Sequence, residues 1–173
     1  MKNYIQKYKI APMGHILKHH FNDICFRIHN LDKKQYPENL DDKNEIIERY
    51  TRCFNIIFNN TDITGYLSTY DTELNELENS WVNELKLKDS VEFNIAEEGE
   101  EAYYVTTYEF SFDKKILKEI ILDVANELFD GSILFYSNNN SLIAPYPGGA
   151  DIFIPDKNLY EKAQKSLSSW VKT

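Results

Sequence analysis

The sequence predicts a single α+β domain over residues 1–173, in which a largely antiparallel sheet packs with four or five helices. Stretches with a helical period of apolar residues alternate with short stretches rich in β-branched and aromatic residues. Several of these short stretches follow one another as in a meander, which favours antiparallel pairing. With 173 residues, 42% of them hydrophobic, the chain is long enough to bury a core of its own.

The first half of the chain predicts two helices and two strands. The elements expected before residue 40 are a lead-in over 1–14, a turn or two of helix over 15–21, a strand over 24–29 and a loop over 30–39. A clear amphipathic helix follows, with apolar residues at helical spacing from Ile46 to Phe58 and an N-cap at Asp41 or Asp42. The next strand, 63–69, contains Gly65, which predicts a β-bulge there.

The second half predicts three more helices and five more strands. A helix capped by Asp71 or Thr72 extends to Leu85, and a longer one begins at Asp113 and ends with a C-cap at Gly131. A last helix opens at Pro155 and continues through residue 170. The predicted strands are 91–95, 103–112, 132–136, 141–144 and 150–154, with a bend at 145–149 before the last of them.

The compartment is predicted from what the sequence lacks. Only two cysteines occur, Cys25 and Cys53, and two such residues do not form the disulfide framework of a small secreted domain. Buried free thiols are the simpler interpretation. The first residues contain no apolar stretch of a signal peptide, and no stretch approaches the roughly 20 apolar residues of a membrane span. We therefore expect a cytoplasmic protein that does not bind membranes.

The negative charge of the chain is concentrated in one segment. The formal net charge is −9, and there are only three arginines, so binding to nucleic acid through phosphates is not expected. From Asp71 to Glu109 the chain has 12 acids and 2 bases, a net charge of −10, whereas the remainder has 16 acids and 17 bases. Either this segment is a solvated helix face and a charged hairpin tip, or it is a docking surface for a basic protein partner.

Aromatic residues lie within the same acidic segment, and aromatic anchors inside a charged rim are typical of protein interfaces. The predicted partner-binding residues are Asp71, Glu73, Glu76, Trp81, Glu97, Glu98, Glu100, Glu101, Tyr103 and Tyr104.

The sequence contains no established catalytic motif, and we predict neither an enzyme nor a cofactor. It has no GxSxG, P-loop or GxGxxG pattern. His15 and His19 share one face of a helix, but no acid joins them in the HExxH pattern, so no metal site is expected. Gly148 and Gly149 lead into a strand rather than into a helix N-terminus, which favours a tight bend over a phosphate cradle.

The C-terminal part of the chain resembles the signature of an uncharacterised bacterial domain family. The residues that carry the resemblance are Tyr146-Pro147-Gly148-Gly149-Ala150-Asp151-Ile152, where the family has Tyr-Asp-Gly-Gly-Ala-Asp-Ile, followed by Tyr160 and Trp170. Two positions depart from the family pattern: Pro147 replaces an Asp, and His29 stands near a usual Glu. The family has no established activity, so the resemblance informs the fold more than the function.

In type, the chain is also similar to immunity proteins of contact-dependent growth inhibition systems, which are small, acidic and free of catalytic motifs. This resemblance implies a protein that binds and neutralises the C-terminal domain of a cognate toxin, of the basic nuclease type, through an acidic surface. The alternative is a small-molecule-binding or enzymatic domain with a pocket near Arg27, His29, Tyr146 and Asp151. That alternative requires these dispersed residues to converge on one face.

Overall fold

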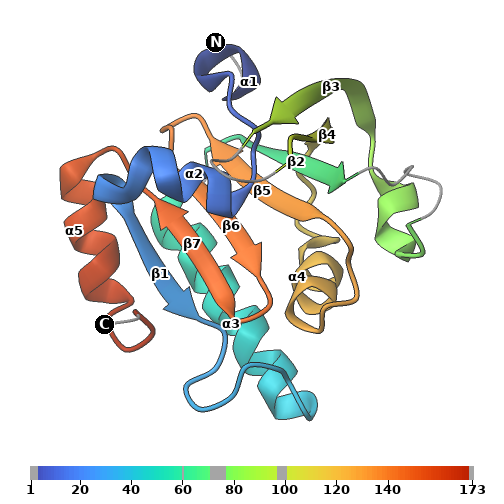
Figure 1. Cartoon of the computed structure of the whole chain (residues 1–173). Coiled ribbons are helices and arrows are strands. Elements are labelled where there is room, and N and C mark those ends of the chain that lie inside the picture. Colours follow the sequence, from blue (N-terminus) through green and yellow to red (C-terminus); the bar gives the residue numbers. More distant parts are fainter. Residues whose placement is uncertain (1–3, 60, 71–76, 97–100, 172–173) are drawn as a thin grey trace.

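The computed structural model describes residues 4–59, 61–70, 77–96 and 101–171 (Figure 1). Within these residues, seven strands form one antiparallel sheet in the order β1-β7-β6-β5-β2-β4-β3, which confirms the predicted α+β class. The strands are β1 (Cys25–His29), β2 (Ile63–Tyr70), β3 (Leu87–Ile95), β4 (Tyr103–Ser111), β5 (Ser132–Ser137), β6 (Leu142–Tyr146) and β7 (Gly149–Phe153). The helices are α1 (Tyr4–Tyr8), α2 (Gly14–Phe21), α3 (Leu40–Ile57), α4 (Leu117–Ala125) and α5 (Lys157–Ser166), with short 3₁₀ turns η1 (Asn22–Ile24) and η3 (Ser80–Glu84).

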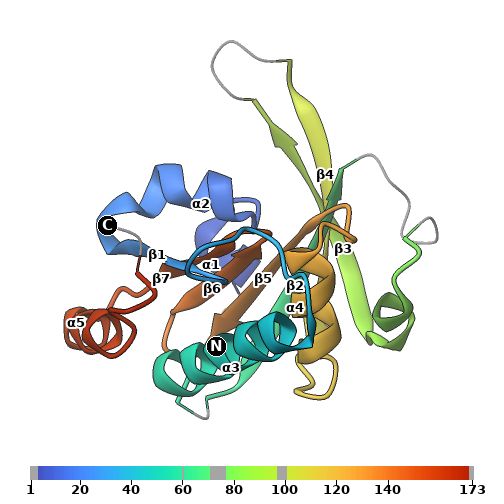
Figure 2. The same ribbon diagram turned by 90° about the horizontal axis from the view of Figure 1, so that it is seen from below.

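Helices cover both faces of the sheet (Figure 2), and apolar side chains pack between the sheet and the helices on each face. Strand β5 has apolar side chains on both faces. Ile133 and Phe135 pack with α3, α4 and α5 on one face, whereas Leu134 and Tyr136 pack with α1 and α2 on the other. A strand covered on both faces is expected to be apolar at successive positions rather than at alternate ones. In the described part of the chain, no helix has the length and apolar character that a membrane span requires.

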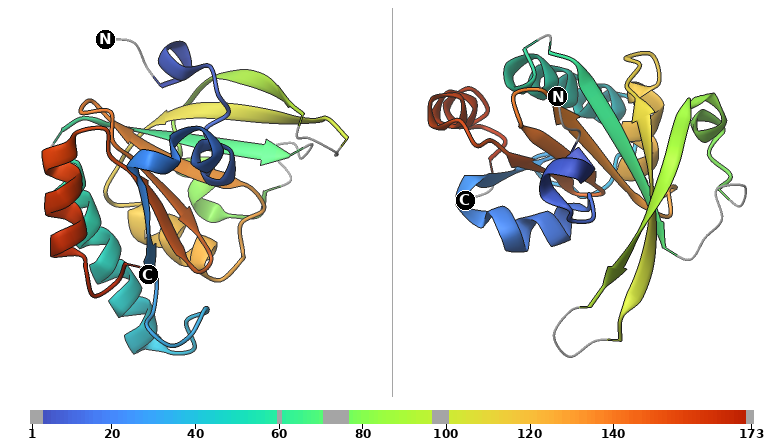
Figure 3. Two further views of the ribbon diagram at one scale, coloured as in Figure 1. Left: turned by 60° about the vertical axis from the view of Figure 1, so that its left-hand side comes forward. Right: turned by 90° about the horizontal axis from the view of Figure 1, so that it is seen from above.

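The two edges of the sheet differ. The C-terminal segment covers β1: Ile28 bridges to Val171, and the amide of His29 donates to the carbonyl of Trp170 at 2.8 Å. Strand β3 forms the opposite edge. There β3 and β4 make a ribbon that extends away from the helices (Figure 3). The described strands of the acidic segment, β3 and β4, therefore lie at the edge of the sheet farthest from β1.

Several predicted element ends were wrong, because capping hydrogen bonds from side chains or from the backbone define them. Asn39, not Asp41 or Asp42, caps α3, since its side chain accepts from the Asp42 amide at 2.9 Å. Helix α4 begins at Leu117 rather than at Asp113, and it ends at Ala125, before the predicted C-cap at Gly131. Glu127 follows it with a φ of 56°, and the Leu128 amide donates to the Asp123 carbonyl, which is the bond of a Schellman cap.

The ends of the chain also differ from the prediction. The lead-in contains α1, whose Tyr4 is fully buried. The last helix begins at Lys157, where Asp156 accepts from the Leu159 amide at 2.7 Å, and it ends at Ser166 rather than at 170. Gly131 lies six residues beyond the end of α4 and is not its C-cap.

The predicted β-bulge at Gly65 does not occur. The pairing of β2 with β4 and with β5 continues in register through this residue. A Cβ at position 65 would lie 2.1 Å from Cζ of Phe110, the residue directly across on β4. Glycine is required here because the ring of Phe110 covers its backbone, which is a packing role and not a turn.

Candidate functional site

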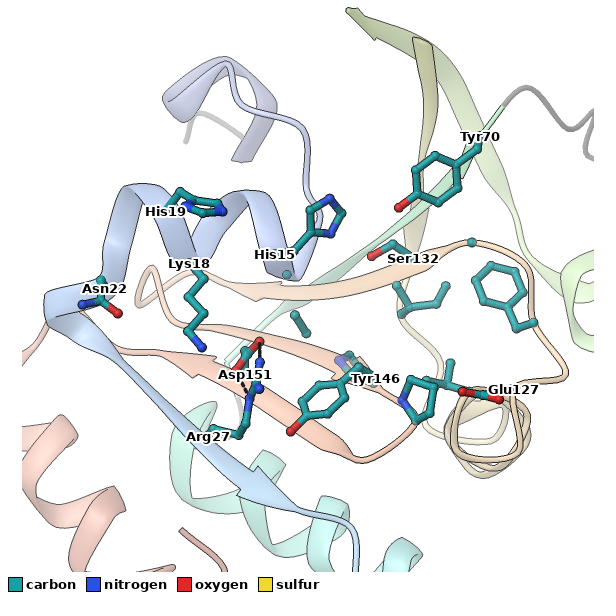
Figure 4. Close-up of a pocket in the computed structure, with 18 residues that line it drawn as sticks. His15, Lys18, His19, Asn22, Arg27, Tyr70, Glu127, Ser132, Tyr146 and Asp151 are labelled. Atoms are coloured by element: carbon teal, nitrogen blue, oxygen red, sulfur yellow. Dashed lines mark hydrogen bonds and ion pairs between the residues drawn. The ribbon is translucent and has the colours of Figure 1, made fainter. Parts of the chain in front are cut away.

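A cleft of about 770 Å³ lies between α2 and the sheet (Figure 4). Its walls come from several parts of the chain: α2 and the start of η1, β1, the end of β2, the C-terminal end of α4, the start of β5, and the hairpin formed by β6 and β7. The volume falls within the range of about 300–1,000 Å³ that is usual for small-molecule sites.

An ion pair between neighbouring strands forms one wall of the cleft. Arg27 on β1 lies directly opposite Asp151 on β7 in the sheet register. Its Nε and Nη2 donate to the two carboxylate oxygens, each at 2.8 Å. The Asp151 side chain is 5% exposed and the Arg27 side chain 31% exposed. The hydrogen bonds from Arg27 to Asp151 raise the pKa of Arg27, because they favour its charged form.

Tyr146, the last residue of β6, packs against this pair. The Arg27 guanidinium lies over the Tyr146 ring at 4.5 Å from the centroid, a cation–π contact. Burial raises the pKa of Tyr146 to about 12, so its hydroxyl stays protonated and can donate a hydrogen bond in the cleft. Figure 4 shows the ring of Tyr146 beside Arg27 and Asp151 on the floor of the cleft.

The turn between β6 and β7 is held in place from several directions. The Asn30 side chain donates to the Pro147 carbonyl at 2.7 Å, and the backbone amide of Asn30 donates to the Gly148 carbonyl at 3.0 Å. The Tyr50 hydroxyl donates to the Gly149 carbonyl at 2.6 Å. A Cβ on Gly149 would lie 1.9 Å from the Ile28 carbonyl oxygen, so only glycine permits this approach to β1. The bend of the predicted signature is a fixed part of the cleft wall.

Helix α2 supplies a row of nitrogen donors along the opposite wall. His15, Lys18 and His19 all line the cleft, and their spacing places them on one face of the helix. Lys18 is exposed and makes no ion pair with any described residue. At the other end of the cleft stands Glu127, whose carboxylate accepts a hydrogen bond from the Tyr36 hydroxyl at 2.9 Å. Figure 4 shows Lys18 and Glu127 on opposite sides of Tyr146.

Three of the four residues of the predicted pocket therefore converge on one cleft: Arg27, Tyr146 and Asp151. His29 lines a neighbouring hollow of about 500 Å³ that shares Arg27 and Tyr146 with the cleft. Lys18 and Glu127 were not predicted. The spacing of Lys18 from His15 and His19 is the signal that places all three on one helix face. Among the described residues, no three His, Cys, Asp or Glu side chains gather as metal ligands.

The predicted partner-binding residues divide into three groups. The residues that lie outside the described part of the chain are Asp71, Glu73, Glu76, Glu97, Glu98 and Glu100. Trp81 is fully buried, and its indole N–H donates to the Asp123 carboxylate at 2.8 Å, so it offers no area to a partner in this conformation.

The third group lies on the ribbon. Glu101 is exposed, and Tyr104 is 50% exposed. Tyr103 is half-buried, with its ring centroid 5.8 Å from that of Tyr70. Glu109, by contrast, is buried and forms an ion pair with Lys88. The described acids of this segment are therefore partly structural and partly available to a partner.

A family model described as a domain of unknown function, DUF3885, matches residues 13–173. The chain belongs to the DUF3885 family. The match begins just before α2 and includes every residue that lines the cleft. Searches of the curated proteins and of the solved structures returned no match to the DUF3885 chain.

Proposed function

We propose that this protein is a binding protein whose ligand is a small polar molecule held in the cleft between α2 and the β6–β7 hairpin. The observation that carries the proposal is the convergence of Arg27, Tyr146 and Asp151, which come from three different strands, with the polar face of α2. Arg27 and Asp151 alone are 124 positions apart in the chain, yet they meet at this one place.

The cleft has the mixed lining that small-molecule sites need. Apolar side chains supply contact area, and a few polar groups orient the ligand. The apolar part includes Ile133, Val124 and Phe129, and the polar part includes Lys18 and Ser132. The anchored turn beside Tyr146 supports a cleft that is formed before a ligand enters, which lowers the entropic cost of binding.

Binding is favoured over catalysis by the state of the reactive groups near the cleft. Asp151 is committed to Arg27 through both of its oxygens and is poorly placed to act as a general base. Burial raises the pKa of the Cys25 thiol to about 12, so it is not a thiolate nucleophile near neutral pH. The proposal is therefore a receptor or sensor domain rather than an enzyme.

Ligand-observed NMR with a panel of small metabolites tests this proposal. The variant Ser132→Trp places an indole in the cleft, and Ser90→Trp, at an exposed position of β3, is its matched control. We expect compounds that bind the wild-type protein to bind Ser90→Trp equally and to lose binding to Ser132→Trp. If they bind all three proteins alike, the cleft is not the site.

The second candidate is the neutralisation of a cognate toxin by an acidic surface, as in immunity proteins. The observation that favours it is the charge of the segment from residue 71 to residue 109, with 12 acids against 2 bases. Part of this segment is the ribbon that extends from the sheet edge, on which Glu92, Glu101 and Tyr104 are exposed. An acidic surface of this kind accelerates encounter with a basic nuclease-type domain and selects against other partners.

Charge reversal tests the second candidate on residues whose positions are known. The protein to be used in this test is the C-terminal fragment of whichever large secreted protein the neighbouring upstream gene encodes. Glu92→Lys with Glu101→Lys should slow association and flatten its salt dependence, whereas Glu48→Lys, on the exposed face of α3, should not. An unchanged association rate in the double variant would remove the ribbon from the interface.

A further inference from the structure

We infer that the ligand of the cleft carries an anionic group, a carboxylate or a phosphate, that binds between Lys18 of α2 and the unused donors of Arg27. The inference rests on the proposed binding function and adds the chemical class of the ligand. It is drawn from the positions of the charges in the cleft.

Arg27 has hydrogen-bond donors that its pair with Asp151 does not use. A guanidinium has five N–H donors, and Asp151 accepts from two of them, which leaves three without a partner among the described residues. The pair with Asp151 fixes the plane of the guanidinium, and the ring of Tyr146 supports one face of it. An arginine held in this way keeps donors in a fixed geometry, which is how proteins bind carboxylates and phosphates.

The end of the cleft beside α2 has a net positive charge. Asp151 neutralises Arg27, so the charge that remains is that of Lys18. Figure 4 shows the Lys18 side chain extending from α2 toward the Arg27–Asp151 pair. Its ammonium has no acid partner among the described residues. His15 and His19 lie one turn apart on the same wall and add imidazole nitrogens.

The opposite end of the cleft has a negative charge. Glu127 lies there, and its Oε1 accepts a hydrogen bond from the Tyr36 hydroxyl. A carboxylate at this end repels a second anionic group and attracts a donor. Figure 4 shows the Tyr146 ring between the two ends, and the lining also includes the apolar side chains of Ile133 and Val124. The cleft therefore suits one anionic group at the α2 end, an apolar body in the middle, and no second anion.

Four probes with the same phenyl body separate charge from shape: benzoate, phenyl phosphate, benzyl alcohol and benzylamine. Binding is measured from amide shifts of α2 and β7 in heteronuclear NMR spectra of the full chain. Lys18→Gln removes the charge, Lys18→Arg restores it, and Lys162→Gln on the exposed face of α5 is the matched control. Lys18 is exposed, so its substitution is compatible with folding.

We expect benzoate or phenyl phosphate to bind more tightly than benzyl alcohol and benzylamine, and the better of the two identifies the anion. Lys18→Gln should lower the affinity for that anion by about tenfold, as expected for a lost hydrogen bond to a charged group. Lys18→Arg and Lys162→Gln should bind the anion with the affinity of the wild-type protein. If benzyl alcohol binds the cleft as well as the anions do, or if Lys18→Gln has no effect, the inference is wrong while the binding function stands. If none of the four shifts a cleft amide, both are contradicted.

Discussion

The ion pair between Arg27 and Asp151 predicts an asymmetry in the cost of removing either partner. Both residues lie in the wall of the cleft, but water reaches them unequally: the side chain of Asp151 is 5% exposed and that of Arg27 is 31% exposed. Removing Arg27 leaves a buried carboxylate without its counter-charge. Removing the charge of Asp151 leaves a guanidinium that water partly solvates.

These exposures set the expected magnitudes. Arg27→Met should lower the free energy of unfolding by about 3–5 kcal/mol, the usual cost of stranding a buried charge. Asp151→Asn should cost about 1–2 kcal/mol, since an amide oxygen still accepts one bond and the arginine remains in contact with water. The double variant should cost less than Arg27→Met alone, because it leaves no uncompensated charge in the sheet.

Urea unfolding followed by circular dichroism measures all three values, provided that the m-value stays constant. Lys162→Met, an exposed residue of α5, is the control for loss of a positive charge. Equal costs for the two single variants, or a double variant that adds within about 0.5 kcal/mol, would refute the reasoning. Either result would mean that the pair is effectively solvated and does not shape the cleft.

Other predictions follow from buried contacts. Gly65→Ala should cost about 3 kcal/mol in thermal unfolding, because the Phe110 ring occupies the space of the new Cβ, and adding Phe110→Leu should recover part of that cost; an unchanged midpoint would contradict the packing role. Trp81→Phe should lower the free energy of unfolding in urea by about 2 kcal/mol, since the indole hydrogen bond to Asp123 is lost. An unchanged free energy would mean that this bond does not stabilise the fold. Burial raises the pKa of Cys25 from 9.0 to about 12, so its contribution to stability is complete below pH 9 and is lost as the pH rises toward 12. Iodoacetamide should therefore label Cys25 at roughly pH 8 much faster in urea than in buffer, and equal rates would contradict its burial.

The fold class was predictable because it depends on local periodicity. Apolar residues at helical spacing from Ile46 to Phe58 are sufficient to predict α3, and the β5–β6 hairpin follows from its Asn-rich turn. Element ends were harder to predict, since they depend on contacts made in three dimensions. Glu127 closes α4 in the left-handed conformation that glycine normally takes, and no local pattern announces this.

The site was predictable only in part, for a related reason. The sequence identified Arg27, Tyr146 and Asp151 as candidates, but the pairing of Arg27 with Asp151 depends on the register of β1 against β7. Trp81 was predicted as an interface anchor because it lies among acidic residues, and this was wrong because its indole is buried against Asp123, 42 residues away. Indole burial of this kind is set by tertiary packing, which a pattern of nearby acids does not reveal.

The position of β1 beside β7 has a consequence for the order of events when the chain is made. The two strands are paired across an interval of 124 residues at Arg27 and Asp151, so one wall of the cleft comes from an early part of the chain and the other from a late part. Long-range strand pairing is slow, since the loop must close before the contact is rewarded. Until β7 has left the ribosome, β1 has no neighbour in the sheet, and Arg27 has no acid to hold it. The nascent chain is thus expected to acquire its binding site in the last stage of folding, all at once.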